Sequence, residues 1–442
     1  MEIQRQVSGF TAVCVLISTV IGSGIFTTTG FMARDLGDPG LILCLWIVGA
    51  LLALAGALSY SELGAALPQA GGEYVYIRHA YGPFAGFLSG WASFTSGFGA
   101  ALAAIAISFA SYFLQAFPLG DNTSDMATIL ALLLVWTLTG VHLRGVGPGG
   151  MLQRLLTILK VGAVALLSMG ALIFGNGDWE NLTIVNPHVA PSFGALLVSL
   201  IFVTYTYSGW NAAGYIAGEI VRPERNIPRA TIWGTLLVGF LYVVLNVVYF
   251  YALSVEALAQ PPVLPVAEKA TVALFGSVAA RLVSLLLCLS TAGAVSAMIW
   301  AGPRIYYAMA RDGVFPAFLS TTGNETGTPR KSIIAQSVWV TLLITTGTFE
   351  QLVIYSGFVL TFFSALAVAA VIILRLQSPT LPRPYRVPFY PVVPLFYVAV
   401  SILILTYTLI ERPIESLLAV ATVLAGAPLY LLWQRTHPFQ SA

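Results

Sequence analysis

Near its start the chain carries a long apolar run that is interrupted by IGSGIF, Ile21 to Phe26, where a membrane-crossing helix should be most regular. In lipid, such an interruption leaves backbone N–H and C=O groups without partners, at a cost of several kcal/mol per group. It is tolerated only where the break lines a cavity within the protein. The stretch therefore predicts a membrane protein with a binding site at this point.

The composition of the rest of the chain agrees with this prediction. Of 442 residues, 58% are hydrophobic and 9% are charged, which is too apolar for a water-facing surface. Apolar stretches of about 20 residues recur along the whole length. We expect an all-α integral membrane protein, one membrane domain over 1–442, with twelve transmembrane helices. They are expected near 8–33, 41–67, 83–117, 126–144, 151–174, 194–221, 229–254, 275–304, 333–348, 353–375, 391–410 and 413–433.

The basic residues predict how the chain is oriented. If the N-terminus is cytoplasmic, 15 of the 20 Lys and Arg residues lie in inner segments, four lie in outer segments, and Lys160 lies within a span. Inner loops of membrane proteins are enriched in Lys and Arg. We therefore expect a multi-pass protein of the plasma or inner membrane with both termini in the cytoplasm.

A second interruption, YTYSGWN at 205–211, lies in the sixth expected span. Because five spans is an odd number, a second five-helix unit must enter the membrane from the opposite side. This predicts inverted repeats over 8–174 and 194–376, followed by two additional helices over 391–433. Paired interruptions at matching positions are typical of a secondary-transporter binding site near the midplane. The alternative is that these small residues only allow helices to pack closely.

The chemistry of the breaks predicts the ligand. A helix that restarts after a break presents free N–H groups and the positive end of its dipole, here at Ser23, Gly24 and Ile25, which suit a carboxylate. A helix that stops presents free carbonyl groups, which suit an ammonium group. The residues expected to present them are Ile21, Tyr205, Thr206 and Ser208. A ligand with both groups on one carbon is an α-amino acid, and its zwitterion needs no charged side chain in the pocket.

Lys160 is the one basic residue expected at membrane depth. It follows Met151 by nine residues, which corresponds to about 14 Å of helix and places it near the middle of a ~30 Å hydrocarbon core. A charged group at that depth indicates a functional site. The alternative is a lysine that snorkels to the interface.

Six motifs in order resemble the amino acid, polyamine and organocation (APC) superfamily of transporters, whose fold is LeuT-type, with a five-plus-five inverted repeat. The motifs are IGSGIF (21–26), PQAGGEYVYIRHAYGPF (68–84), YSGWN (207–211), GEIVRPERNIPRA (218–230), AGPRIYYAMARDGVFP (301–316) and RPYRVPFYPVVP (383–394). The sequence SGWN is most similar to the L-type amino acid transporter branch and its bacterial relatives. The resemblance implies an exchanger or proton-coupled symporter of L-amino acids, favouring neutral ones, that works by alternating access around broken helices 1 and 6.

The resemblance also implies roles for individual residues. Ser23 and Gly24 match the backbone donors for the substrate carboxylate, and Tyr205 matches an aromatic gate. The positions that match carbonyl partners of the amine are Ile21, Tyr205 and Ser208. Asn211 matches a polar residue of the sixth-helix break. Lys160 takes the place of a sodium ion, touching the first helix and Ser290, as a coupling group or a fixed charge.

Several kinds of site and partner are not expected in this chain, and some functional alternatives stay open. No catalytic residues, cofactor, metal site or nucleic-acid partner is expected, and neither a Walker A sequence nor a nucleophile–base pair stands out. L-type light chains use a cysteine between spans 3 and 4 to bind a partner subunit, and because 117–126 contains none, no covalent partner is expected. The alternatives are a cationic amino acid or polyamine carrier and, in another class, a membrane amino-acid sensor. Glu62 and Glu219 form either an inner gate or ordinary interfacial ion pairs.

Overall fold

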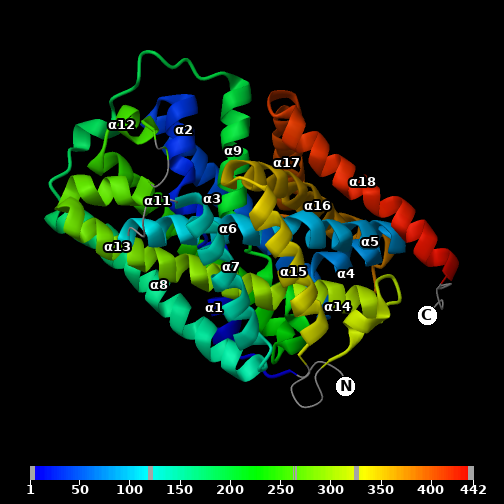
Figure 1. The fold of residues 1–442 in the computed structure, drawn as a ribbon. Helices are drawn as coiled ribbons and strands as arrows, with labels where there is room; N and C mark the ends of the chain where they lie inside the picture. The colour runs from blue at the N-terminus through cyan, green and yellow to red at the C-terminus, as the bar shows by residue number, and fades with distance from the viewer. Residues whose placement is uncertain (1–4, 118–122, 262, 264–265, 323–327, 437–442) are drawn as a thin grey trace.

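The fold was analysed in a computed structural model that describes residues 5–117, 123–261, 263, 266–322 and 328–436. Within these residues the regular structure is helical, apart from one isolated parallel bridge between Val7 and Ile220 (Figure 1). The all-α class predicted from the sequence is therefore confirmed for the described residues. Residues 118–122, in the segment without cysteine between expected spans 3 and 4, lie outside this description.

The first half of the chain is a run of helices with one early break. Its elements are α1 (Gly9–Val20), η1 (Gly24–Phe26), α2 (Thr28–Leu36), α3 (Pro39–Ala66), α4 (Glu73–Tyr81), α5 (Pro83–Ala92), the π-helical turn η2 (Ser93–Gly97), α6 (Gly99–Ala116), α7 (Thr123–His142) and α8 (Val146–Phe174). The predicted interruption in the first span is present, because α1 ends at Val20 and helical structure resumes at Gly24.

The second half begins with the loop that follows α8 and contains the other break. Its elements are η3 (Trp179–Leu182), α9 (Phe193–Tyr207), α10 (Ala212–Tyr215), η4 (Ala217–Glu219), α11 (Pro223–Ala252), α12 (Val255–Ala259), α13 (Val266–Ala301), α14 (Pro303–Arg311), η5 (Ala317–Ser320), α15 (Arg330–Thr346), α16 (Phe349–Gln377), α17 (Val392–Glu411) and α18 (Pro413–Thr436). The second predicted interruption is also present, between Tyr207 and Ala212.

Nine helical segments among the described residues are long and apolar enough to cross a membrane. They are Pro39–Ala66, Pro83–Ala116, Asp125–His142, Gly149–Phe174, Pro223–Ala252, Arg281–Arg311, Phe349–Gln377, Val392–Glu411 and Pro413–Trp433. The first and sixth expected spans are the two broken ones, whose apolar parts Gly9–Val20 and Phe193–Tyr207 are shorter. The ninth expected span, near 333–348, corresponds to α15, which has 17 residues. Length and composition therefore support nine of the twelve expected spans.

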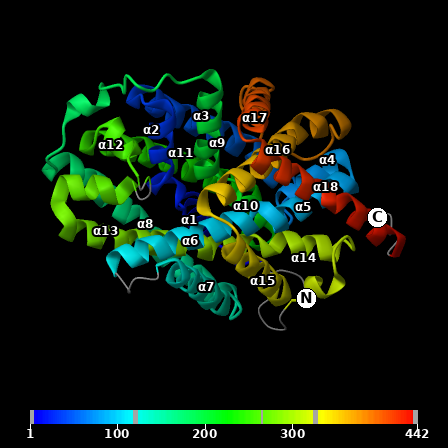
Figure 2. The same ribbon diagram turned by 45° about the horizontal axis from the view of Figure 1, so that its top comes forward.

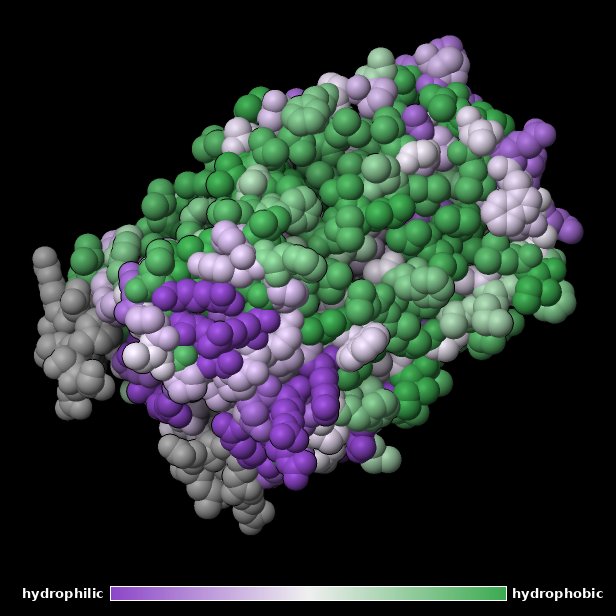
Figure 3. Space-filling view, turned by 180° about the vertical axis from the view of Figure 1, so that it is seen from behind, coloured by the Kyte–Doolittle hydropathy of each residue, from purple (hydrophilic) through white to green (hydrophobic). Residues whose placement is uncertain are grey.

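Burial separates the central helices from the outer ones. In the apolar windows of Pro83–Ala116 and Arg281–Arg311, 72% of residues are buried, whereas the windows of α7, α8, α17 and α18 have only 22 to 33% of their residues buried. Inside, α6 packs along α13, and α3 packs along α11 (Figures 1 and 2). On the face shown in Figure 3 the surface is broadly apolar, and its hydrophilic residues gather mainly at the lower left, with a smaller group at the upper right. This pattern suits a protein enclosed by lipid.

Candidate functional site: a pocket between two broken helices

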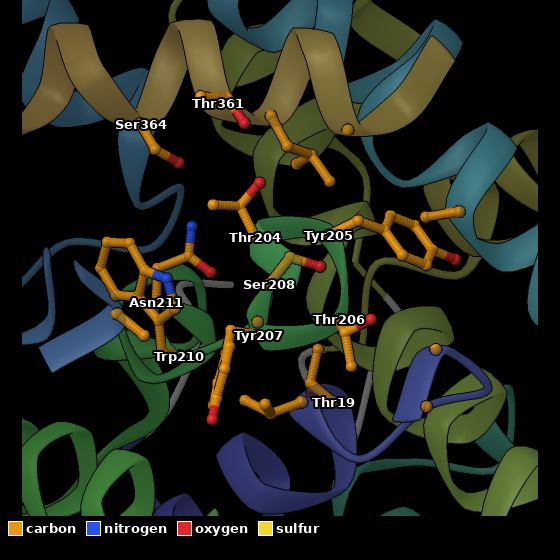
Figure 4. A pocket seen from close by; sticks show the side chains of 18 of the residues that line it. Thr19, Thr204, Tyr205, Thr206, Tyr207, Ser208, Trp210, Asn211, Thr361 and Ser364 are labelled. Atoms are coloured by element: carbon orange, nitrogen blue, oxygen red, sulfur yellow. The ribbon is translucent and has the colours of Figure 1, made fainter. Parts of the chain in front are cut away.

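A pocket lies between the two helix breaks. It is lined by the end of α1 and the turn after it, by the end of α9 and the turn after it, and by side chains from α3, α6, α16 and α17. Figure 4 shows Thr19 on one side, Tyr205 to Asn211 across the middle, and Thr361 and Ser364 pointing in from α16. Segments almost 200 residues apart thus form one cavity.

Two glycines bring the breaks into direct contact. A Cβ added to Gly24 would lie 2.3 Å from Thr206 Oγ1, and one added to Gly209 would lie 2.7 Å from a methyl group of Thr19. Gly209 also has a φ of +101°, a backbone conformation that favours glycine. The glycines at these positions therefore allow each broken helix to pack against the other.

The restart of the first helix offers backbone donors to the pocket. Within the described residues, no hydrogen bond is found from the amide N–H groups of Ser23, Gly24 and Ile25. The turn is 3-10 in form, because Phe26 N donates to Ser23 O at 3.0 Å and Thr27 N donates to Gly24 O at 3.0 Å. Three adjacent free amides at a helix start form an anion-binding group.

The carbonyl groups at the helix ends are partly occupied. Tyr205 O accepts from Ser208 N at 2.9 Å, and Thr206 O lies 3.3 Å from the hydroxyl of Tyr242. Ile21 O accepts from Lys160 Nζ at 2.5 Å. Ser208 O accepts no hydrogen bond from the described residues. Of the four carbonyl groups predicted from the sequence, that of Ser208 is the one without a hydrogen bond from the described residues.

Tyr242 of α11 joins the two breaks and was missed by sequence reasoning. Its hydroxyl lies 2.7 Å from Val20 O and 3.3 Å from Thr206 O, at the ends of α1 and α9. The side chain is 1% exposed, so this hydroxyl is a buried donor with two possible acceptors. A tyrosine in an apolar helix carries no sequence signal that distinguishes it from a packing residue.

Lys160 reaches the same broken helix from the side facing α8. Its Nζ donates to Ser18 O at 2.9 Å, Ser18 Oγ at 3.2 Å and Ile21 O at 2.5 Å, which uses all three ammonium protons. The side chain is fully buried. Lys160 and Ser290 line one small cavity, although no hydrogen bond joins them. The lysine therefore does not snorkel; it contacts the first helix, and its role as a coupling group or fixed charge stays a prediction.

Glu73 of α4 is a buried carboxylate behind the pocket wall. Its Oε1 accepts from Tyr60 Oη at 2.5 Å, Asn211 Nδ2 at 2.8 Å and Ser364 Oγ at 2.9 Å, and Tyr215 is a further hydrogen-bond partner. Burial raises the pKa of the Glu73 carboxyl, and the donors oppose that shift by stabilising the charged form. Sequence reasoning did not single out this residue.

Glu62 and Glu219, for which the sequence leaves both an inner gate and ordinary interfacial pairing open, each form ion pairs. Glu219 is 1% exposed, and its Oε1 lies 2.7 Å from Nη2 of Arg304, which is 2% exposed. Glu62 receives Arg375 Nη2 on Oε2 at 2.5 Å and lies 3.4 Å from Nε of Arg383. The Glu219 pair is buried and links the segment after the sixth-helix break to α14.

Six of the eight predicted substrate residues line the pocket between the two breaks: Ser23, Gly24, Tyr205, Thr206, Ser208 and Asn211. Ile21 and Ile25 are fully buried and are not part of that lining. Lys160 and Ser290 belong to the smaller neighbouring cavity. Within the described residues, no group of three or more His, Cys, Asp or Glu side chains could hold a metal ion.

The sequence matches one family model and several known proteins. The sequence model of the family described as "Amino acid permease" matches residues 7–427. The large neutral amino acids transporter small subunit 2 of Oryctolagus cuniculus is 30% identical over 98% of this chain and 82% of its own length. The serine/threonine exchanger SteT of Bacillus subtilis is 31% identical over 97% and 96%. The b(0,+)-type amino acid transporter 1 of Mus musculus is 28% identical over 98% and 88%.

Proposed function

This chain belongs to the amino acid permease family, and from that membership and its pocket we propose that it is a secondary transporter that exchanges neutral L-amino acids across a cell membrane. Its apolar helices and its family indicate a multi-pass membrane protein. The relatives named above are transporters, and none is named as an enzyme. Two of their names specify neutral substrates or serine and threonine.

The observation that carries this proposal is the group of three unbonded amides at Ser23, Gly24 and Ile25 beside a pocket lined by both breaks. In the proposed complex these amides hold the substrate carboxylate. The ammonium group binds carbonyl oxygens at the ends of α1 and α9, with Ser208 O as the main acceptor, and Tyr205 covers the substrate. Asn211 contributes to the side-chain end of the pocket.

The wider architecture is proposed in the same terms. Five helices over 8–174 and five over 194–376 form inverted repeats with two additional helices over 391–433, which makes twelve spans with cytoplasmic termini. Alternating access moves one part of the protein against the other around the two breaks. Lys160 serves as a fixed or exchangeable positive charge at the end of α1, a position that leaves no need for sodium.

A carrier of cationic substrates is less well supported. Glu73 is an acidic group near the pocket, and its Oε1 already accepts three hydrogen bonds from residues that include Asn211 and Ser364 of the lining. The carboxylate is therefore not presented to a ligand. The described residues that line the pocket carry no charged side chain, which suits a substrate with a neutral side chain.

Uptake of labelled L-amino acids into proteoliposomes tests the function. We expect uptake of neutral amino acids that depends on amino acid inside the vesicles and ignores sodium. Uptake into empty vesicles that follows an inward proton gradient would identify a proton symporter instead. Binding without flux under every condition would reject transport and identify a sensor.

A further inference from the structure

Asn211 lines the pocket with a carboxamide that is held in one orientation. Its Nδ2 donates to Glu73 Oε1 at 2.8 Å and to Tyr215 Oη at 2.9 Å, so both amide hydrogens are used. The flipped amide would place Oδ1 against the carboxylate oxygen of Glu73, and two acceptors repel. Only the Asn211 oxygen is therefore left to face a ligand.

The picture of the pocket agrees with this orientation. In Figure 4 the nitrogen of Asn211 is directed towards Ser364, and its oxygen is directed into the open centre of the pocket, towards Ser208. Asn211 is 6% exposed and lies in the break of the sixth helix. A buried carbonyl oxygen that faces a pocket requires a donor from whatever fills it.

Glu73 also commits the hydroxyl hydrogen of Ser364. Ser364 Oγ lies 2.9 Å from Glu73 Oε1, an oxygen that also accepts from Tyr60 Oη and Asn211 Nδ2, so the serine hydroxyl is the donor of this hydrogen bond. The hydroxyl of Tyr397 is already a hydrogen-bond partner of Ser364, whereas that of Thr361, another lining residue, can donate or accept. The wall around Asn211 therefore suits a group that donates one hydrogen bond and can also accept one, which describes a hydroxyl.

We propose that Glu73 is a positioning residue that turns Asn211 and Ser364 into hydrogen-bond acceptors, so that the pocket selects amino acids with a side-chain hydroxyl. The inference rests on the proposed function and adds a substrate class to it. Threonine and valine form the natural probe pair, because they have nearly the same shape and differ by one hydroxyl. A site built to bond a hydroxyl discriminates against the analogue that lacks it far more strongly than an apolar pocket does.

The test is competitive exchange in proteoliposomes, measured as KM and maximal rate for threonine and for valine. For the unaltered protein we expect a KM roughly tenfold or more lower for threonine, because valine leaves the Asn211 oxygen without a partner. Equal KM values would overturn this proposal without contradicting the proposed transport function. Transport of neither amino acid, nor of any other neutral one, would instead reject the proposed function.

Substitutions at Glu73 separate positioning from packing. Glu73→Gln keeps an oxygen that accepts from Asn211 and Ser364, so we expect it to retain the threonine preference. Glu73→Met keeps the length of the side chain but frees the Asn211 amide to turn, so the threonine and valine KM values should converge. A purely structural role predicts a lower rate for both substrates with an unchanged KM ratio, which would overturn the proposal.

Ser364→Ala provides a milder second variant if Glu73→Met does not fold. It removes one acceptor while leaving Tyr60 and Asn211 bonded to Glu73, and we expect a KM ratio between those of the unaltered protein and Glu73→Met. An unchanged ratio in this variant would count against the proposal. Ser356→Ala is the matched control, because Ser356 is a buried serine of the same helix that bonds to Leu352 O and does not line the pocket.

Discussion

The ammonium nitrogen of Lys160 lies 2.5 Å from the carbonyl oxygen of Ile21, the first residue after α1 ends. The same nitrogen also donates to Ser18 O and Ser18 Oγ, so one side chain from α8 binds the polar groups of the last turn of α1. A carbonyl at such an end normally lacks an intrahelical partner. On one side of the first break, Lys160 therefore donates hydrogen bonds to the carbonyl groups of the helix end. On the other side, the unbonded amides of Ser23, Gly24 and Ile25 lie beside the pocket.

Replacing Lys160 with methionine removes the charge and keeps most of the volume. We expect exchange to fall at least tenfold, because Ser18 O and Ile21 O lose their buried donor, at a cost on the order of 1–3 kcal/mol for each unpaired group. The measurement is exchange rate together with thermal stability in detergent. Lys269→Met is the control, since Lys269 is half-buried at the start of α13, and an exchange rate unaffected by Lys160→Met would exclude a role for the charge.

Gly24→Ala should prevent the two breaks from meeting. The new Cβ would lie 2.3 Å from Thr206 Oγ1 and 2.9 Å from its Cβ, so one element must shift. We expect loss of exchange with the protein still present in the membrane, and partial recovery in the double variant with Thr206→Ala. Gly162→Ala is the matched control, because nothing lies within 4 Å of the added Cβ. Full activity in Gly24→Ala would show that the close approach is dispensable.

Tyr242→Phe removes the hydroxyl that lies between Val20 O and Thr206 O. We expect a loss of about 1 kcal/mol in stability and a higher KM for all neutral substrates, because the helix ends are held less firmly. Tyr249→Phe on the same helix is the control: its buried hydroxyl has no hydrogen-bond partner among the described residues. Identical effects of the two substitutions would argue against a role for the bridge.

Arg304→Ala should be strongly destabilising. It leaves the Glu219 carboxylate buried without its cation, which typically costs roughly 3–5 kcal/mol. Arg34→Ala breaks an exposed pair with Asp35, where the expected cost is at most about 1 kcal/mol. Thermal unfolding of both variants in detergent checks the contrast, and similar unfolding temperatures would mean that the buried pair contributes little.

Much of the site was predictable because its signals are local. The glycine and serine residues of IGSGIF and YTYSGWN interrupt apolar runs that are long enough to cross a membrane. Each break, and the cavity that must accompany it in lipid, is therefore predictable from the local sequence. The expected depth of Lys160 rests on counting residues along its helix and stays a prediction. The number of spans was less accessible, because broken helices and the 17-residue α15 do not reach the usual length.

The remaining partners depend on how distant segments pack. Tyr242 meets Val20 across 222 residues, and Glu73 meets Ser364 across 291. Nothing in the neighbouring sequence distinguishes these side chains from ordinary packing or loop residues. The apolar pattern and the helix breaks thus follow from local chemistry in the bilayer. Which carbonyl each donor satisfies, and which way Asn211 faces, arises only when the helices are assembled, since buried polar groups must find partners wherever the fold brings them.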